Sequence, residues 1–402
     1  MNVGKSVFAQ LMSLVPWYEF GKCVDKYGGD YKVQKFTTRQ QFLVMCLAQL
    51  TRRESLRDIE SCLNAIPEKL YHAGIRQKIK KFTLADANEV RDYRMFAEFA
   101  QVLISTAREL YKTENDFKLE LENIAYALDS TTIDLCLTLF PWVRFRKRKG
   151  AVKAHILLDF RGSIPTFIEI TDGLFHDVNI LDQLILEPGA FYVMDRAYID
   201  FLRLYRFNKC AAFFVTRGTS NLRFKRINAA VVDKTTGLRC DQTIRLTGFY
   251  SEQHYPDTLR RVRFYDEEQK RTFVFLTNNF DVPALTIAQL FKERWKIELF
   301  FKWIKQHLKI KAFYGNSQNA VYAQIWIAVC SYLLLAIAKK RWQLEETLYT
   351  ISQVLEFCIF DKISINELFT NNNKFNFDTQ KDNQLNLFNL KPDSTDPKCI
   401  FA

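Results

Sequence analysis

Two aspartates follow apolar runs that have the texture of β-strands. Asp129 lies in IAYALDSTTIDL (124–135), and Asp195 follows the run FYVM in GAFYVMDRAYID (189–200). Ligands of α/β sheets collect at the carboxyl ends of strands, so both carboxylates are expected at such an end. Because burying two like charges side by side is costly, this pair predicts a bound cation.

A third acid, Glu298, lies in the basic and aromatic segment FKERWKIELFFKWIK (291–305). At about 100° per residue, a helix places Glu298 in one narrow stripe with Phe291, Arg294 and Lys305. The neighbouring stripe is apolar, as expected for a helix packed on a sheet: Ile297, Phe301, Ile304 and Leu308. Glu298 is therefore predicted at the edge of the buried face. A solvent-exposed ion pair is the alternative for this glutamate.

Three carboxylates form the hard oxygen donor set that suits Mg²⁺ or Mn²⁺. Two such ions about 4 Å apart activate a water or hydroxyl and stabilise the leaving oxygen in phosphoryl transfer. Long cations beside the metals, here Arg294 and Lys305, neutralise a scissile phosphate and its neighbours. The alternative is that the three acids are unrelated surface residues.

Composition points to a nucleic-acid partner. Lys and Arg outnumber Asp and Glu by 57 to 45, which gives a formal net charge of +12 and attracts polyanions. The 402 residues, 48 % of them hydrophobic, exclude wholesale disorder and predict two or three domains. Nine cysteines without a CxxC pair exclude a zinc ribbon and make a disulfide framework improbable, as in a reducing compartment.

The most apolar segment, IWIAVCSYLLLAIA (325–338), is shorter than the roughly 20 residues of a membrane span. It is predicted to be a buried core helix. The N-terminus has no long apolar region followed by a small-residue cleavage site. These features predict a soluble, cytoplasmic protein without membrane association.

The chain divides by texture into a helical part and an α/β part. Residues 1–118 are predicted to form a helical N-terminal domain, with helices at 37–50 and 53–66. The basic segment after them, with Arg76, Lys78, Lys80 and Lys81, permits two readings. One is a helix-turn-helix-like DNA-binding unit, and the other is a plain bundle packed on the main domain.

Residues 119–216 are predicted to form the first part of a mixed α/β sheet. Its expected elements are strands at 124–135, 153–160, 165–173, 189–194 and 211–216, with helices at 179–186 and 199–208. Residues 217–277 alternate polar and apolar positions and predict an inserted antiparallel β subdomain rich in Arg and Lys. The second part of the core spans 278–345, with helices at 284–309 and 318–341. Residues 346–402 are a helical segment and a polar tail.

Further candidates for phosphate contact surround the two aspartates. The basic run before the second strand contains Arg146, Lys147 and Arg148. Arg196 and Tyr198 directly follow Asp195. Lys153 and His155, and the pair His176–Asp177, lie between the two aspartates, but without a motif such as GxSxG they do not indicate a hydrolase. Trp295 and Trp303 are expected in the core or at its rim, with stacking on an unpaired base as the minority interpretation.

The order Asp129, Asp195, Glu298, with a β insertion before the last acid, resembles the ribonuclease-H-like core of DDE transposases. More narrowly, the chain is similar to the insertion-sequence-four family, whose signature is Tyr, two residues, Arg, three residues, Glu, six residues, Lys. Arg294, Glu298 and Lys305 match it in type and spacing, whereas Phe291 stands at the Tyr position. The stretches YALDST and VMDRAY look like the first two acid motifs. The resemblance covers roughly residues 120–340.

The resemblance implies an α/β, ribonuclease-H-like mixed sheet and a transposase that cuts at element ends and joins them to target DNA. It implies Mg²⁺, with Mn²⁺ as a substitute, bound by the catalytic acids Asp129, Asp195 and Glu298. The implied DNA-contacting residues are Arg294, Lys305, Arg196, Tyr198, Arg146, Lys147 and Arg148. The partners would be terminal inverted repeats, target DNA and a second copy in a homodimer. The setting would be the bacterial cytoplasm at the nucleoid.

Two other functions stay open at this point. One is a sequence-specific DNA-binding protein with an inactive transposase-derived core, for which the departure at Phe291 leaves room. The other is a ribonuclease-H-fold nuclease of repair or recombination. The β insertion and the helix signature weigh against the nuclease, and the intact acids favour the transposase.

Overall fold

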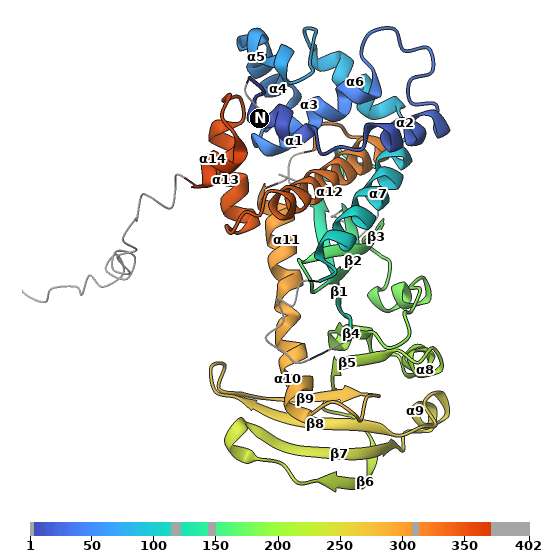
Figure 1. Ribbon diagram of the computed structural model, residues 1–402. Helices are drawn as coiled ribbons and strands as arrows, with labels where there is room; N and C mark the ends of the chain where they lie inside the picture. The colour runs from blue at the N-terminus through green and yellow to red at the C-terminus, as the bar shows by residue number, and fades with distance from the viewer. Residues whose placement is uncertain (1–3, 114–120, 122, 144–149, 308–312, 371–402) are drawn as a thin grey trace, which may run out of the picture.

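The computed structural model describes residues 4–113, 121, 123–143, 150–307 and 313–370. Nine strands form one sheet in the order β3-β2-β1-β4-β5-β9-β8-β7-β6. Helices from both ends of the chain gather at the β1–β3 end of the molecule, and the strands β6–β9 lie at the opposite end (Figure 1). The predicted mixed α/β class with N-terminal helices is confirmed.

The first half of the sheet holds both aspartates. β1 (Ala125–Leu135), β2 (Gly150–Asp159) and β3 (Ile164–Asp172) are antiparallel neighbours. β4 (Phe191–Met194) pairs with β1 in parallel, and β5 (Phe213–Arg217) pairs with β4 in parallel. These five strands follow the predicted ones closely.

The helix predicted at 179–186 is wrong in type. The structure has a 3₁₀ helix, η1 (Asp177–Asp182), whose N-terminal residue His176 makes no capping bond through its side chain. Ile180 and Leu181 are buried under the sheet, but Pro188 and Gly189 soon turn the chain toward β4. The apolar pattern therefore predicted the burial of Ile180 and Leu181 correctly. The segment forms a 3₁₀ helix because it is too short for a regular α-helix.

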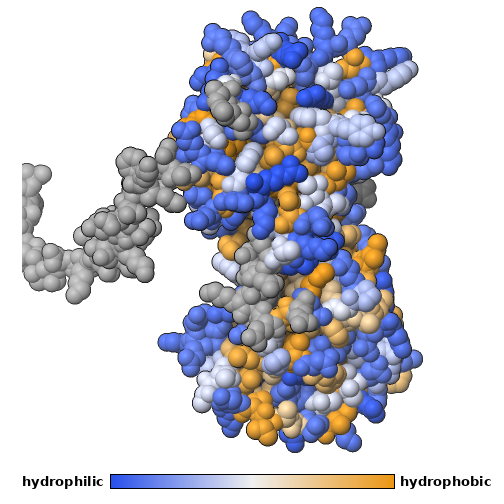
Figure 2. Space-filling view, in the orientation of Figure 1, coloured by the Kyte–Doolittle hydropathy of each residue, from blue (hydrophilic) through white to orange (hydrophobic). Residues whose placement is uncertain are grey.

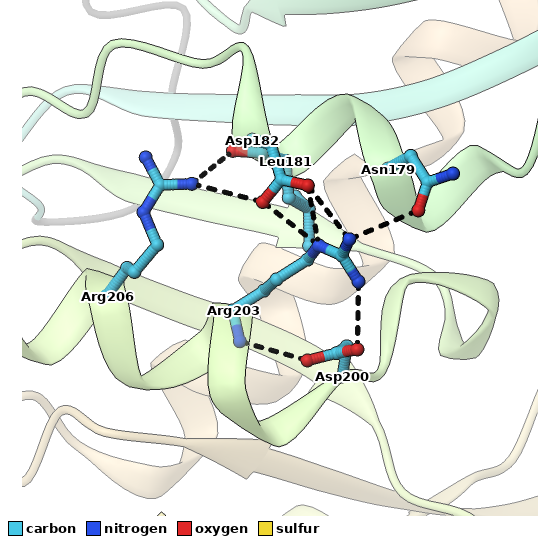
Figure 3. A network of polar contacts seen from close by, with 6 residues as sticks. All are labelled: Asn179, Leu181, Asp182, Asp200, Arg203 and Arg206. Carbon is cyan, nitrogen blue, oxygen red and sulfur yellow. Dashed lines mark hydrogen bonds and ion pairs between the residues drawn. The ribbon is translucent and has the colours of Figure 1, made fainter. Parts of the chain in front are cut away.

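A network of ion pairs ties η1 to α8 (Phe201–Lys209), which follows β4 (Figure 3). The Arg203 guanidinium donates to Asp182, Asp200 and Asn179, and Nη1 of Arg206 donates to the carbonyl of Leu181. A second 3₁₀ turn, η2 (Arg196–Tyr198), lies between β4 and α8. The segments before and after β4 are therefore fastened to each other.

The segment predicted as an inserted antiparallel β subdomain extends the main sheet. Its strands are β6 (Phe224–Ala230), β7 (Leu238–Leu246), β8 (Leu259–Asp266) and β9 (Arg271–Thr277). They are antiparallel as predicted, with η3 (Lys234–Thr236) and α9 (Phe249–His254) between them. Because β9 also pairs with β5, one continuous sheet links both halves.

The helix predicted over 284–309 is two helices, α10 (Ala284–Glu293) and α11 (Trp295–His307), which meet at Arg294. They run along the sheet from the β8–β9 end toward the helical end (Figure 1). α12 (Gln318–Arg341) is long and apolar enough to cross a membrane, but its apolar window is wholly buried in the structure. It forms the centre of the helical layer, as the sequence predicted for 325–338.

The N-terminal helices pack around α12 in one shared core. They are α1 (Val7–Met12), α2 (Trp17–Lys26), α3 (Thr38–Leu50), α4 (Leu56–Ala65), α5 (Pro67–His72), α6 (Lys81–Val90) and α7 (Arg94–Tyr111). The C-terminal helices α13 (Leu348–Cys358) and α14 (Ile365–Thr370) join the same layer. The Thr37 hydroxyl caps α3 by accepting a hydrogen bond from Gln40 N. The outer face of this layer is mainly hydrophilic (Figure 2).

Candidate active site

The alternation of side chains along β1 and β4 decides which way the two aspartates face. Ala125 and Ala127 of β1, and Val193 of β4, belong to the core on the side of α10 and α11. Asp129 and Asp195 continue these series and share that side. The register pairs Leu128 with Met194 in parallel, so each aspartate comes directly after the last parallel pair.

Asp129 does not end its strand as predicted. β1 continues to Leu135 because β2 pairs with it along its whole length. It is β4 that ends, at Met194, one residue before Asp195. The two carboxylates therefore lie at neighbouring positions where the parallel pairing of the sheet stops, about one strand spacing (~4.8 Å) apart in backbone.

Arg294 connects Asp129 with the third acid. Its Nη1 lies 2.9 Å from Oδ2 of Asp129, and its Nη2 lies 2.6 Å from Oε1 of Glu298. α11 packs against β1, which brings these residues together across 165 positions of sequence. Ile297 is buried and the Glu298 side chain is 47 % exposed, so Glu298 lies beside the buried face and forms the exposed ion pair that was its alternative interpretation.

Burial raises the pKa of Asp129 to about 6. The Ser130 N–H, which donates to Oδ1, and the Arg294 guanidinium oppose this rise, whereas the charges of Asp195 and Glu298 add to it. The charges of Asp195 and Glu298 therefore both contribute to the raised pKa of Asp129. Arg294 thus joins two of the three carboxylates, and the third, Asp195, acts on Asp129 through its charge.

The donor set fits a divalent cation. Oδ1 of Asp195 is buried and has no hydrogen-bond partner in the structure. Asp129 and Glu298 already hold a cation, the Arg294 guanidinium, between them. In this conformation, no three or more His, Cys, Asp or Glu side chains of the described ranges approach closely enough to hold a metal ion. The carboxylates would therefore have to draw closer around an ion.

A polar cluster lies on the opposite side of β1. Ser130 donates to Oδ1 of Asp177 at 2.8 Å, and the Lys153 ammonium donates to the same oxygen at 3.2 Å and to the carbonyl of Phe175. Lys153 is thus engaged inside the protein. His155 is fully buried, and burial lowers its pKa to about 4, so it is neutral at neutral pH. The hydrogen bond to Asp177 fixes Ser130, the residue that follows Asp129.

A cavity of about 500 Å³ opens beside Glu298. It is lined by cations and aromatic rings, among them Arg217, Phe273, Phe275, Phe291, Lys292 and Trp295. The Phe291 ring lies 4.9 Å from that of Phe275 and 5.6 Å from the Arg294 guanidinium. Sequence reasoning missed Arg217, which ends β5, and the rings of β9. The only available signal was the alternation in RTFVFLT (271–277), because strand pairing decides which cavity these rings face.

The predicted DNA-contacting residues differ in accessibility. Arg196 is exposed beside Asp195, and Lys305 is half-buried on α11. Tyr198 is only 1 % exposed, so its side chain is not available to DNA in this conformation, because η2 folds it under the sheet. Arg146, Lys147 and Arg148 lie outside the described residues. Trp303 is buried in the core, whereas Trp295 is 58 % exposed at the cavity rim.

Comparison with known proteins places this geometry in a family. Residues 121–334 match the family described as "Transposase DDE domain", and residues 3–76 match "Domain of unknown function (DUF4372)". A "Putative transposase y4zB" of Sinorhizobium fredii is 34 % identical over 287 residues, which cover 70 % of this chain and 78 % of the relative. A solved piggyBac transposase synaptic complex with hairpin DNA has a TM-score of 0.44 at 9 % identity, with coverage of 96 % and 84 %.

Two further relatives come from insertion sequences. A "Probable transposase for insertion sequence element IS5377" of Geobacillus stearothermophilus is 30 % identical over 235 residues, 58 % of this chain and 60 % of the relative. A "Putative transposase for insertion sequence element IS4SA" of Synechocystis is 27 % identical over 285 residues, 70 % and 78 %. The chain belongs to the Transposase DDE domain family, and it is a DNA transposase, an enzyme of DNA cleavage and strand transfer.

Proposed function

We propose that this transposase cleaves DNA at the terminal inverted repeats of its own element and joins the ends to target DNA, with Asp129, Asp195 and Glu298 as catalytic metal ligands. The observation that carries the proposal is the parallel register of Leu128 with Met194, together with the Arg294 bridge from Asp129 to Glu298. The register supports neighbouring backbone positions for Asp129 and Asp195, and the bridge joins Asp129 to Glu298 through one cation.

A divalent cation held there, Mg²⁺ or Mn²⁺, would lower the pKa of a water or 3′-hydroxyl and offset charge on the leaving oxygen. The protein's own part is to orient the acids: β1 and β4 fix Asp129 and Asp195, and α11 presents Glu298. Ser130, held by Asp177, stiffens the strand beside Asp129. In phosphoryl transfer the protein contributes mainly by positioning the reacting groups, and strands and a packed helix can hold the acids in fixed positions.

Cations around the acids would hold the DNA backbone. Arg217 lines the cavity beside Glu298, Arg196 is exposed next to Asp195, and Lys305 lies two turns beyond Glu298 on α11. Phosphate contacts of this kind position the duplex and carry no sequence information. The basic run at 144–149 is proposed as a further backbone contact, on its charge alone.

We further propose a ribonuclease-H-like core of the insertion-sequence-four type. The strand order β3-β2-β1-β4-β5, with β4 and β5 parallel to β1, supports the core. The spacing of Arg294, Glu298 and Lys305 on α11 and the strands β6–β8 before them support the subfamily. Phe291 at the Tyr position is this chain's departure.

The division of labour follows the folding units. Residues 1–118 are proposed to bind DNA, 119–216 and 278–345 to form the catalytic core, 217–277 to form a β-rich insertion subdomain, and 346–402 to be a C-terminal helical segment and polar tail. Two element ends must be held together for joining, which supports a homodimer in the active complex. The relatives from bacterial insertion sequences support action in the cytoplasm at the nucleoid.

The decisive experiment measures cleavage of a DNA duplex that carries the element's own ends. The substitutions Asp129→Asn, Asp195→Asn and Glu298→Gln keep side-chain shape and remove the ligand charge. Each is expected to lower the rate in Mg²⁺ by a factor of about a thousand or more, because several kcal/mol of transition-state stabilisation are lost. DNA binding at fixed salt should be largely retained.

The matched control is Asp172→Asn, at the end of β3 and outside the acid cluster. It should cleave at about the wild-type rate. Undiminished cleavage in any of the three acid variants would remove that residue from the catalytic set. Cleavage in a metal-free buffer with chelator would overturn the metal-dependent reaction as a whole.

A further inference from the structure

We propose that Arg294 is an exchangeable counter-ion: in the metal-free enzyme its guanidinium occupies the cation position between Asp129 and Glu298, and metal binding displaces it toward the adjacent cavity. The inference rests on the proposed function, because it takes these acids as metal ligands. It adds a second state for Arg294, which would then couple metal loading to DNA contact.

The contacts of Arg294 are those of a cation held in a carboxylate site. Two different nitrogens of one guanidinium approach two different acids, at 2.9 Å from Asp129 and 2.6 Å from Glu298. The side chain is only 16 % exposed. Without a cation there, carboxylates that share a partly buried site repel each other. Arg294 therefore performs the charge neutralisation that a divalent ion would otherwise perform.

The inward position of Arg294 is incompletely satisfied. Its Nε is buried and has no hydrogen-bond partner among the residues that the structure describes, which is unfavourable for a charged donor. The backbone is irregular at the same residue, because Arg294 N donates to Phe291 O at 3.2 Å and Ile297 N donates to Arg294 O at 3.1 Å. These bonds span three residues and mark the break between α10 and α11. A side chain at such a break can be redirected without disturbing a regular helix.

The displaced guanidinium has a place to go. Arg294 already lines the cavity of about 500 Å³ beside Glu298, and its guanidinium lies 5.6 Å from the Phe291 ring, which forms part of the same wall. A cation over an aromatic face is attracted to it. In the cavity the guanidinium is released from the carboxylates and can pair with a DNA phosphate. One side chain cannot neutralise both partners at once, so metal and DNA binding should promote each other.

The first test measures Mn²⁺ binding by calorimetry on the full-length protein without DNA. Wild-type Arg294 must be displaced, so Arg294→Gln is expected to bind Mn²⁺ roughly five- to a hundredfold more tightly. Lys292→Gln is the matched control, because it removes the same charge from the same cavity. Lys292 pairs with Glu268 at 2.6 Å and is 58 % exposed, so its loss should change the affinity by no more than about twofold.

The second test uses guanidinium chloride as a probe of the vacated position. In Arg294→Ala, low millimolar guanidinium is expected to raise the thermal midpoint, and Mn²⁺ should compete with it. Lys292→Ala should show no such gain. Where Arg294→Ala does not fold, Arg294→Lys serves instead: its single ammonium cannot span both acids, so Mn²⁺ affinity should lie between those of the wild type and Arg294→Gln.

The outcomes separate this inference from the function on which it rests. Equal Mn²⁺ affinity in wild type, Arg294→Gln and Arg294→Lys, with affinity still lost in Asp195→Asn, would overturn the exchange and leave the catalytic acids standing. Mn²⁺ affinity that is unchanged in Asp195→Asn would overturn the acids as ligands, and the exchange with them. A gain in Arg294→Gln that Lys292→Gln reproduces would show a general charge effect, and would also overturn the exchange.

Discussion

The ring of Phe291 packs beside Phe275 and under the Arg294 guanidinium, in the wall of the cavity next to Glu298. This ring has no hydroxyl, whereas the signature of the proposed insertion-sequence-four subfamily has Tyr at this position. The cavity gives a hydroxyl at this position access to whatever phosphate lies beside the acids. At this position the chain therefore differs from the signature only by the missing tyrosine hydroxyl.

Phe291→Tyr is expected to fold normally and to raise cleavage or end-complex formation by up to about a hundredfold. The physical reason is one added hydrogen bond to a charged group, which is worth roughly 1.5–3 kcal/mol. Rates for both proteins are compared on the same end substrate at fixed salt. Phe273→Tyr is the control, since Phe273 lines the same cavity on β9. A folded Phe291→Tyr enzyme no faster than wild type would show that this site has adapted to Phe.

At the scale of the elements, the position of Asp195 depends on the short strand β4. Its four residues set the register that brings Asp195 beside Asp129. The chain before it is a short 3₁₀ helix and the chain after it is a turn, so neither supplies a long regular element as support. The Arg203 network between η1 and α8 provides that support from both sides (Figure 3).

Arg203→Ala should lower the free energy of unfolding by about 1–2 kcal/mol, as read from urea denaturation. The estimate stays modest because Asp182 is half exposed, and exposed ion pairs contribute little individually. Arg206→Ala, which removes a more exposed partner of the same Asp182, should cost less. A loss in Arg206→Ala as large as in Arg203→Ala would mean that Arg203 has no special role in holding η1 to α8.

At the scale of the whole molecule, one sheet of nine strands joins the helical layer to the β6–β9 end. The acids lie near its middle, on the side covered by α10 and α11. The chain has a formal net charge of +12 at pH 7. DNA affinity should therefore fall steeply with salt, by a log–log slope of about −0.9 for each phosphate contact.

Replacing Arg146, Lys147 and Arg148 together with Ala should flatten that slope by roughly two to three units. The slope is measured from equilibrium binding to an end duplex at several salt concentrations. Arg203 and Arg206 are the control pair, because both already form ion pairs with Asp182. Their joint replacement should leave the slope unchanged. An unchanged slope in the Arg146–Arg148 variant would place DNA binding elsewhere.

Local pattern was enough for much of this protein. The apolar run of FYVM and the apolar stripe of Ile297, Phe301 and Ile304 each predict burial, and the structure agrees. Leu308 of the same stripe lies outside the described residues. The 325–338 segment is likewise a core helix. Such features follow from periodicity within a dozen residues, which any single segment carries in itself.

Only the tertiary structure decided the pairings. β9 pairs with β5, so the predicted β insertion is continuous with the main sheet. The side chain of Tyr198 is buried, and the segment predicted as a helix at 179–186 begins with a 3₁₀ helix that ends at Asp182. Arg294 forms an ion pair with Asp129, 165 residues away. Strand neighbours and ion-pair partners depend on the free energy of contacts between distant segments, and no local spacing encodes them.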